Sequence, residues 1–266
     1  MRLLLLALLG SSTLSLSLAL PSTPASTSLQ PDEQPNPHSP SFALQPDALR
    51  LPTFDASASS TKVPVTLGVM SKCPDAQVCE ILFDRVLDQV GSMVDISLTY
   101  IGSIDKEDKY GVHCMHGESE CLGNIQQLCV AKYWQGPSGE VNPWADWWNF
   151  VQCVNYGPTS RIGSEDLAKS CAKVVKHEWN HQIEHCVSSD EGAELLQESV
   201  KKAKAMSLVK SCTVVIGGKA VCIHDGTWKQ CPEGHEVGDF TRQIKAEYKR
   251  LNQVDYNSEA DADEEE

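Results

Sequence analysis

The sequence is short of positive charge. Its 22 lysine and arginine residues stand against 36 aspartate and glutamate residues, which gives a formal net charge of −14 at pH 7. Such a balance repels nucleic acids and anionic lipid surfaces, so neither a nucleic acid nor a membrane is expected as a partner. The chain also lacks an Asn-x-Ser/Thr sequon, so N-glycosylation is not expected. Beyond the N-terminal region, no stretch approaches the ~18 apolar residues of a membrane-spanning helix, and the mature protein is expected to be soluble.

The first 20 residues form a distinct segment. Met1 and Arg2 precede the apolar run Leu3–Leu9, and a second apolar run with small residues ends before Pro21. This pattern predicts a secretory signal peptide over residues 1–20. Export places the chain in an oxidising environment, where its eleven cysteines should be mostly paired.

Composition divides the rest of the chain into three parts. Residues 21–60 are dominated by Pro, Ser, Thr and Ala without apolar periodicity, which predicts a disordered linker. Residues 253–266 are nearly all acidic or small, which predicts a disordered acidic tail. The intervening residues 61–252 are numerous enough for one hydrophobic core, so we expect one domain there.

The opening of this domain reads strand, helix, strand. Residues 63–70 are apolar and β-rich, residues 74–90 place apolar side chains at helical spacing, and residues 93–100 alternate like a second strand. Pro74 suits the first position of a helix and Asp75 its positively polarised first turn. A crossover of this length predicts parallel strands and the first half of a thioredoxin fold.

The remainder predicts helices first and then strands. Helical patterns open at residues 143–150, 164–167 and 191–206, and we interpret the tryptophans of the first as core residues. Two β-rich runs flank Gly217-Gly218 as a hairpin, and an amphipathic helix spans residues 237–251. The predicted fold class is α/β: a thioredoxin-like fold split by an α-helical insertion.

The most distinctive stretch runs from Cys114 to Cys129 and reads C-M-H-G-E-S-E-C-L-G-N-I-Q-Q-L-C. Gly117 can take the positive φ of a tight turn, and Asn124 can cap a helix. Three cysteines and a histidine are plausible zinc ligands. Export favours disulfides over a metal here, so we expect no metal site.

This stretch resembles the signature of the gamma-interferon-inducible lysosomal thiol reductase (GILT) family. Seven positions match at fixed spacing: Cys114, His116, Gly117, Glu120, Cys121, Asn124 and Cys129. The resemblance covers about residues 63–232 and implies the same split thioredoxin-like fold. It also implies reduction of disulfide-containing protein substrates with a small thiol as reductant and without a cofactor. The destination would be extracellular or a lysosome or vacuole.

Cys73 takes the position of the family's nucleophile, the first cysteine of a C-x-x-C pair. A thiolate at a helix N-terminus is stabilised by the helix dipole and by free N–H groups, although a structural cysteine remains the alternative. The second position of the pair is Ala76, so the thiol that would resolve a mixed disulfide is missing. Cys79 is a less suitable partner, because six helical residues place it ~9 Å along the axis, beyond the ~7 Å Cα limit for a bridge.

The resemblance implies that six cysteines are structural and staple the helical insertion: Cys114, Cys121, Cys129, Cys153, Cys171 and Cys186. Six cysteines make three disulfides, although the sequence allows fifteen connectivities. We expect the signature to be chiefly structural, with its first two cysteines oxidised. Cys222 and Cys231 are expected to pair with each other. Three cysteines remain, an odd number, so at least one thiol is free or joined to a partner.

Cys212 is the candidate resolving thiol. In thioredoxin-like folds the residue before the third strand is usually a cis-proline that touches the active-site cysteine, and Cys212, or within one residue Ser211, falls at that position. Without a proline a cis bond is not expected, since it costs ~3 kcal/mol. A thiol there could reach Cys73 and form the bridge that Ala76 rules out. The alternative is a buried, inert cysteine.

One further motif suggests a metal. His177-Glu178-x-x-His181 matches the H-E-x-x-H pattern of zinc proteases, with His185 as a conceivable third ligand. On one helix the outer histidines would lie ~12 Å apart along the axis, whereas zinc ligands lie ~2.1 Å from the ion. Asn180 resembles an N-cap that would interrupt the helix. We therefore interpret this stretch as a solvated, histidine-rich helix end.

Two hypotheses follow for function. The first is a GILT-like thiol–disulfide oxidoreductase that acts through Cys73. The second, suggested by Ala76, is a secreted, disulfide-stapled binding or structural module that has lost turnover.

Overall fold

The computed structural model describes residues 60–253. The predicted signal peptide, all of the linker but residue 60 and all of the acidic tail but residue 253 lie outside the described residues. Within residues 60–253, none of the helices is both long and apolar enough to span a membrane.

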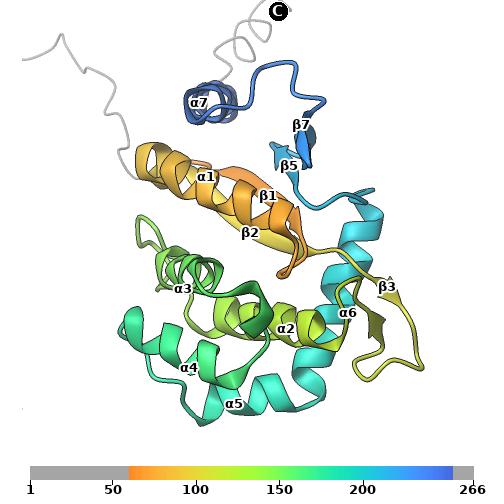
Figure 1. Cartoon of the computed structure of the whole chain (residues 1–266). Coiled ribbons are helices and arrows are strands. Elements are labelled where there is room, and N and C mark those ends of the chain that lie inside the picture. The colour runs from red at the N-terminus through yellow and green to blue at the C-terminus, as the bar shows by residue number, and fades with distance from the viewer. Residues whose placement is uncertain (1–59, 254–266) are drawn as a thin grey trace, which may run out of the picture. The chain divides into compact units, whose positions relative to one another are not determined.

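The centre of the described chain is a five-stranded sheet with the strand order β2-β1-β5-β6-β7 (Figure 1). β1 (Val63–Val69) and β2 (Val94–Tyr100) are parallel, and α1 (Pro74–Val90) connects them. Successive side chains of β1 point to opposite faces of the sheet, and nearly all of them are buried, as is usual for a strand covered on both sides. The predicted strand–helix–strand crossover is confirmed.

The other half of the sheet is antiparallel. β5 (Thr213–Ile216) pairs with β1, and β6 (Lys219–Asp225) pairs with β5 across the predicted Gly217-Gly218 turn. Both glycines have positive φ. A short strand that the sequence did not predict, β7 (Thr227–Lys229), extends the sheet, and α7 (Val237–Asn252) packs on α1. A parallel β-α-β unit followed by a hairpin and a helix is the thioredoxin-like fold, as predicted.

The insertion between β2 and β5 is helical, as expected. It contains α2 (Glu118–Tyr133), α3 (Ala145–Tyr156), α4 (Glu165–Val174), α5 (His181–Ser188) and α6 (Asp190–Ala205). A two-stranded ribbon of β3 (Ser103–Ile104) and β4 (Val112–His113), too short to be read from the sequence, precedes these helices. A 3-10 turn, η2 (Thr159–Arg161), lies between α3 and α4, and another, η1 (Gly91–Met93), lies outside the insertion, between α1 and β2. Figure 1 shows the helices gathered on the β2 side of the sheet, away from α7.

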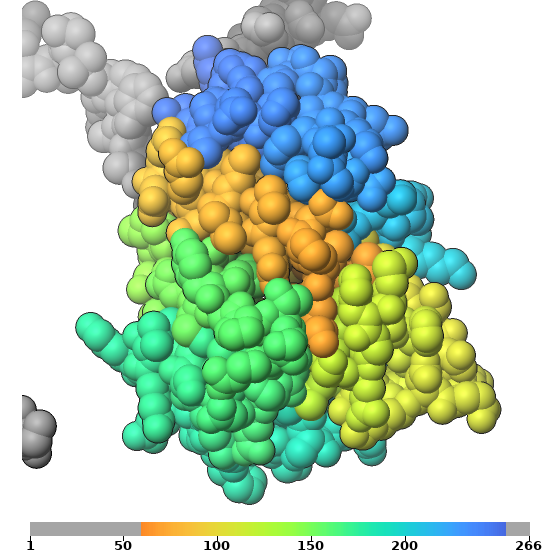
Figure 2. All heavy atoms as spheres, in the orientation of Figure 1, coloured from red at the N-terminus to blue at the C-terminus, as the bar shows by residue number. Residues whose placement is uncertain are grey.

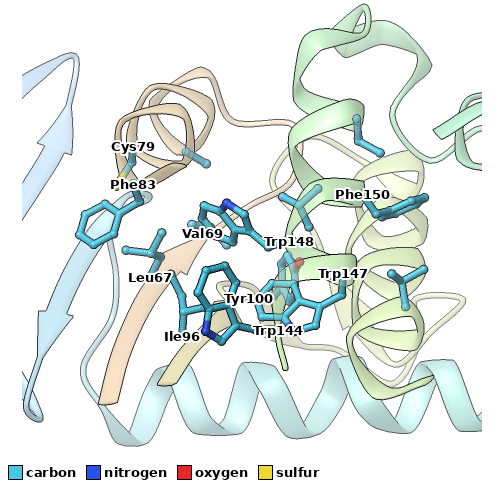
Figure 3. Packing of buried hydrophobic residues seen from close by; sticks show 14 of the residues in the cluster. Leu67, Val69, Cys79, Phe83, Ile96, Tyr100, Trp144, Trp147, Trp148 and Phe150 are labelled. Atoms are coloured by element: carbon cyan, nitrogen blue, oxygen red, sulfur yellow. The ribbon is translucent and has the colours of Figure 1, made fainter. Parts of the chain in front are cut away.

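The tryptophans near the start of α3 join the insertion to the sheet, which confirms their interpretation as core residues (Figure 3). Trp144 Nε1 donates to the carbonyl of Val94 at 3.2 Å, and Trp148 Nε1 donates to Asp84 Oδ1 at 2.9 Å. Buried indoles are stable when their N–H groups find acceptors, so these bonds fix α3 against both β2 and α1.

Three disulfides staple the insertion, as predicted. They are Cys114–Cys121, Cys129–Cys186 and Cys153–Cys171. The second joins α2 to α5 across 57 residues, and the third joins α3 to α4 across 18. In the chain-entropy view, closing loops of this size stabilises the native state by about 3–4 kcal/mol each. The predicted Cys222–Cys231 bridge is also present.

Two local details of the insertion test the sequence interpretation. Asn124 does not cap a helix: α2 starts earlier, after Gly117, whose φ is 84°, and Asn124 is buried in its second turn. Asn180 is the N-cap of α5, with Oδ1 accepting from the N–H of Ile183 at 3.1 Å. His177 therefore lies outside α5 and stacks on Trp134, so the H-E-x-x-H residues do not share one helix.

Candidate active site around Cys73

Cys73 is the N-cap residue of α1, directly before Pro74. Its N–H donates to the carbonyl of Met70 at 2.9 Å, and its own carbonyl accepts from Gln77 at 3.2 Å. Pro74 starts the helix because its fixed φ suits the first turn and its missing N–H costs no hydrogen bond there. The thiol therefore lies at the end of the helix where the dipole stabilises negative charge.

Cys73 is the one cysteine of the described chain that is not in a disulfide, and all eleven cysteines fall within residues 60–253. This confirms the expectation that at least one thiol is left over from the disulfides within the chain, free or joined to a partner. The side chain is only 7% exposed, and its Sγ lies 3.9 Å from the carbonyl oxygen of Ser211. Figure 2 shows the segment around the start of α1, in orange, reaching the surface between the green insertion and the yellow-green signature region.

The structure corrects the pairing expected for Cys212. This residue lies directly before β5, as predicted, but it is bonded to Cys79 and not to Cys73, with a Cα–Cα distance of 6.2 Å. Helical periodicity explains the difference. Positions 76, 79 and 83 share the face of α1 that is buried on the sheet, where Figure 3 shows Cys79 beside Phe83, whereas Cys73 caps the end of the helix. Cys79, which we judged less suitable as a partner of Cys73, is thus the partner of Cys212.

The peptide bond between Ser211 and Cys212 is cis, so the expectation of a trans bond at this position is wrong. The segment is held on both sides. Cys212 exchanges two backbone hydrogen bonds with His224 of β6, at 2.9 and 3.0 Å. The hydroxyl of Ser211 accepts from the N–H of Met70 at 3.0 Å, which ties the segment to the loop before Cys73.

The signature stretch supports the loop that carries Cys73. Asn124 Oδ1 accepts from the N–H of Ser71 at 3.0 Å, and Glu120 Oε2 accepts from the N–H of Lys72 at 3.3 Å. The Ser71 hydroxyl donates to the carbonyl of Glu120 at 3.2 Å. Asn124 and Glu120 are both fully buried, so these bonds replace water for the loop's backbone.

The remaining signature residues hold this support in place. The Glu120 carboxylate also accepts from the N–H of His116 at 3.1 Å and contacts its Nδ1. The Cys114–Cys121 disulfide closes the turn at Gly117. The expectation that this pair is oxidised is confirmed, and the contacts give the stretch a structural role in positioning the Cys73 loop.

A contact missed from the sequence joins the first turn of α1 to the hairpin. Asp75 Oδ1 lies 2.7 Å from His224 Nδ1 and accepts from the N–H of Gly226 at 2.9 Å. His224 is largely buried and meets Trp228 edge to face at 4.8 Å. No local pattern marks His224, because its partner lies 149 positions earlier in the chain (224 − 75). The pair fixes the start of α1 relative to β6.

Glu80, also missed from the sequence, lies fully buried on α1. Burial raises the pKa of its carboxyl from 4.5 to about 7, against the opposing effect of a 2.6 Å hydrogen bond from Asn155. Three nearby oxygens, Glu80 Oε1, Gln152 Oε1 and Asn155 Oδ1, have no hydrogen-bond partner within residues 60–253. A neutral carboxyl brings an O–H donor to this group of acceptors, so the geometry also favours protonated Glu80.

A groove of about 730 Å³ adjoins the Cys73 loop at Met70. Its lining is mostly apolar and includes Ile101, Leu208 and Val209. Val209 lies two residues before Ser211. Its side chain is 75% exposed, which is high for an apolar residue. The lining of the groove therefore includes Met70, three residues before the thiol, and Val209, two residues before Ser211.

The fold and the site together define a thioredoxin-fold protein with one free thiol at the start of its first helix. Solved structures with a related chain path include BdbD from Bacillus subtilis (oxidised), at 14% identity over 70% of this chain and 88% of that one, with a TM-score of 0.49. Another is the thiol-disulfide exchange protein alpha-DsbA2 from Wolbachia pipientis, at 8% identity over 70% of this chain and 82% of that one, with a TM-score of 0.47.

Residues 64–175 match the sequence profile of the gamma interferon inducible lysosomal thiol reductase (GILT) family. A gamma-interferon-responsive lysosomal thiol protein of Arabidopsis thaliana is 25% identical over 56% of this chain and 58% of its own. A gamma-interferon-inducible lysosomal thiol reductase of Carassius auratus is 25% identical over 56% of each chain. The match thus spans somewhat more than half the length of these curated relatives. Over residues 64–175, less than half of the chain, the sequence is thus similar to the GILT family.

Proposed function

We propose that this protein is a thiol–disulfide oxidoreductase that reduces protein disulfides through Cys73. The observation that carries the proposal is the free thiol of Cys73 at the N-terminus of α1, on a loop held by the family's signature residues. The Cys73 thiolate attacks one sulfur of a substrate disulfide and releases the other as a thiolate. The resulting mixed disulfide is then opened by a second thiol, such as a small external reductant.

The substrates we propose are polypeptides with accessible disulfides. The support is the groove that begins at Met70, because apolar side chains such as Ile101 and Val209 suit an extended or unfolded chain. Two lysines, Lys201 and Lys204, also line the groove and favour acidic residues in the bound segment. A small disulfide would need none of these contacts.

We propose that the protein enters the secretory pathway by its N-terminal signal sequence and works in a lysosome or vacuole, extracellular release being the alternative. Support comes from the names of the relatives, which are lysosomal proteins. We also propose that residues 21–60 serve as a linker before the domain and that residues 253–266 form an acidic tail after it.

A second candidate function is a binding or structural module without turnover. Ala76 favours it, because this position carries no thiol to resolve a mixed disulfide.

Insulin reduction by the purified protein, with dithiothreitol or glutathione and at acidic and neutral pH, separates the two functions. The oxidoreductase predicts reduction above the background rate and its loss in Cys73→Ser, a variant whose fold is checked by circular dichroism. If wild type reduces insulin no faster than Cys73→Ser, the oxidoreductase function is refuted and the binding or structural module remains.

A further inference from the structure

Three cysteines converge where α1 meets the segment before β5. Cys79 and Cys212 form a fully buried disulfide. The Sγ of Cys73 lies 3.9 Å from the carbonyl oxygen of Ser211, the residue directly joined to Cys212. A free thiol thus faces the chain segment that carries a disulfide, inside a fold whose family position for a resolving thiol is occupied by Ala76.

From this arrangement we propose that Cys79 and Cys212 are the redox pair that resolves the mixed disulfide on Cys73. The inference rests on the proposed function, because it assumes that Cys73 exchanges with substrate disulfides. In the working form all three cysteines are thiols. The described structure is the oxidised product, with Cys73 free and the other two bridged.

The sequence of bonds balances without another oxidant. The Cys73 thiolate attacks the substrate disulfide, which forms a mixed disulfide and releases the first substrate thiolate. The Cys212 thiolate then attacks Cys73 Sγ, forms a Cys73–Cys212 bond and releases the second substrate thiolate. Finally the Cys79 thiolate attacks Cys212 Sγ and frees Cys73. Two electrons pass from the Cys79/Cys212 dithiol to the substrate, and the two protons that this dithiol loses are taken up by the substrate thiolates.

Burial decides how the pair is reduced again. Cys79 and Cys212 are both 0% exposed, so an external thiol has no direct access to their disulfide, whereas Cys73 keeps 7% of its surface exposed. The reductant therefore acts through Cys73. Cys73 attacks Cys212 and releases Cys79, and a small thiol such as glutathione then attacks Cys73 and releases Cys212. A second molecule of the same thiol frees Cys73.

The first test measures how fast glutathione opens the Cys79–Cys212 disulfide, by alkylation and peptide mass mapping of the folded, full-length protein. Cys73→Ser should slow this reduction at least about tenfold relative to wild type, because it removes the only thiol with access to the pair. The Cys153–Cys171 disulfide in the same samples is the internal control, and its rate of opening should be the same in both proteins. Equal rates of Cys79–Cys212 opening in both proteins would overturn the proposal.

The second test is a single turnover of wild type. The protein is mildly reduced, freed of reductant and mixed with one equivalent of oxidised glutathione. We expect the Cys79–Cys212 bridge to reform with Cys73 free. Glutathione retained on Cys73, with Cys79 and Cys212 both alkylated, would contradict the proposal while leaving reduction through Cys73 intact.

Two variants should trap the intermediates. Cys212→Ser should accumulate the mixed disulfide on Cys73, and Cys79→Ser should accumulate a Cys73–Cys212 bridge. No adduct on Cys73 in any of these proteins, with insulin reduction equal in wild type and Cys73→Ser, would instead refute the proposed function. If either of these two variants does not fold, the first two tests still decide, since neither uses Cys212→Ser or Cys79→Ser.

Discussion

Replacing Glu80 by glutamine should make the protein more stable at neutral pH and nearly insensitive to pH between about 4.5 and 7. Glutamine has the shape of the neutral carboxyl and keeps an oxygen for the hydrogen bond from Asn155. It cannot ionise, so it removes the cost of burying a carboxylate beside Gln152 and Asn155.

The magnitude follows from the pKa of Glu80, which burial raises from 4.5 to about 7. Between these two pH values the unfolded chain has released the proton while the native protein keeps it. The native state therefore binds more protons, and the free energy of unfolding falls as pH rises through this window. A difference of about 2.5 pK units at 1.36 kcal/mol each gives a total loss of about 3 kcal/mol in wild type by pH 7.5.

Surface acids act in a different pH range. The pKa values of Asp225, Asp239 and Glu247 are lowered, chiefly by hydrogen bonds from Lys229, from the backbone of Glu236 and from Arg250 respectively. Their stabilisation is present above the unfolded pKa values and is lost as pH falls through the lowered folded values, so it changes little between pH 4.5 and 7. It is also common to wild type and the variant.

The assay is urea unfolding without reductant at pH 4.5, 5.5, 6.5 and 7.5. Glu80→Gln should match wild type within about 1 kcal/mol at the lowest pH and exceed it by up to about 3 kcal/mol at the highest. Glu198→Gln, at an exposed position of α6, is the matched control and should follow wild type throughout. A stability difference between Glu80→Gln and wild type that does not grow with pH would refute the reasoning.

Two further predictions concern the groove and the loop. Val209→Glu should raise the KM for reduction of an acidic disulfide peptide several-fold and leave exchange with oxidised glutathione unchanged, because only the polypeptide occupies the groove; equal effects on both substrates would exclude that role. Asn124→Ala leaves the buried N–H of Ser71 without its acceptor, so it should cost about 1–3 kcal/mol in urea unfolding and speed alkylation of Cys73. Asn149→Ala, at an exposed position of α3, is its control, and unchanged alkylation would show that Asn124 does not hold the Cys73 loop.

Local chemistry in the sequence was enough to place the elements that surround the site. Pro74 put Cys73 at the start of a helix, Asn180 interrupted the H-E-x-x-H stretch, and Gly217-Gly218 turned the last hairpin. These signals act within a few residues, since a cap, a fixed φ or a positive φ depends on its immediate neighbours. The odd cysteine count also predicted a free or partner-bound thiol, and the resemblance marked the six cysteines that staple the insertion.

Only the tertiary structure decided how the site is assembled. The partner of Cys212 depends on which face of α1 packs on the sheet, and the two bridged cysteines are 133 positions apart. Asn124 looked like a cap, yet it accepts from Ser71, 53 positions earlier. The neutral state of Glu80 depends on burial beneath α3. Each of these contacts joins elements that are distant in the chain, and their energies depend on desolvation and mutual geometry that local propensities do not contain.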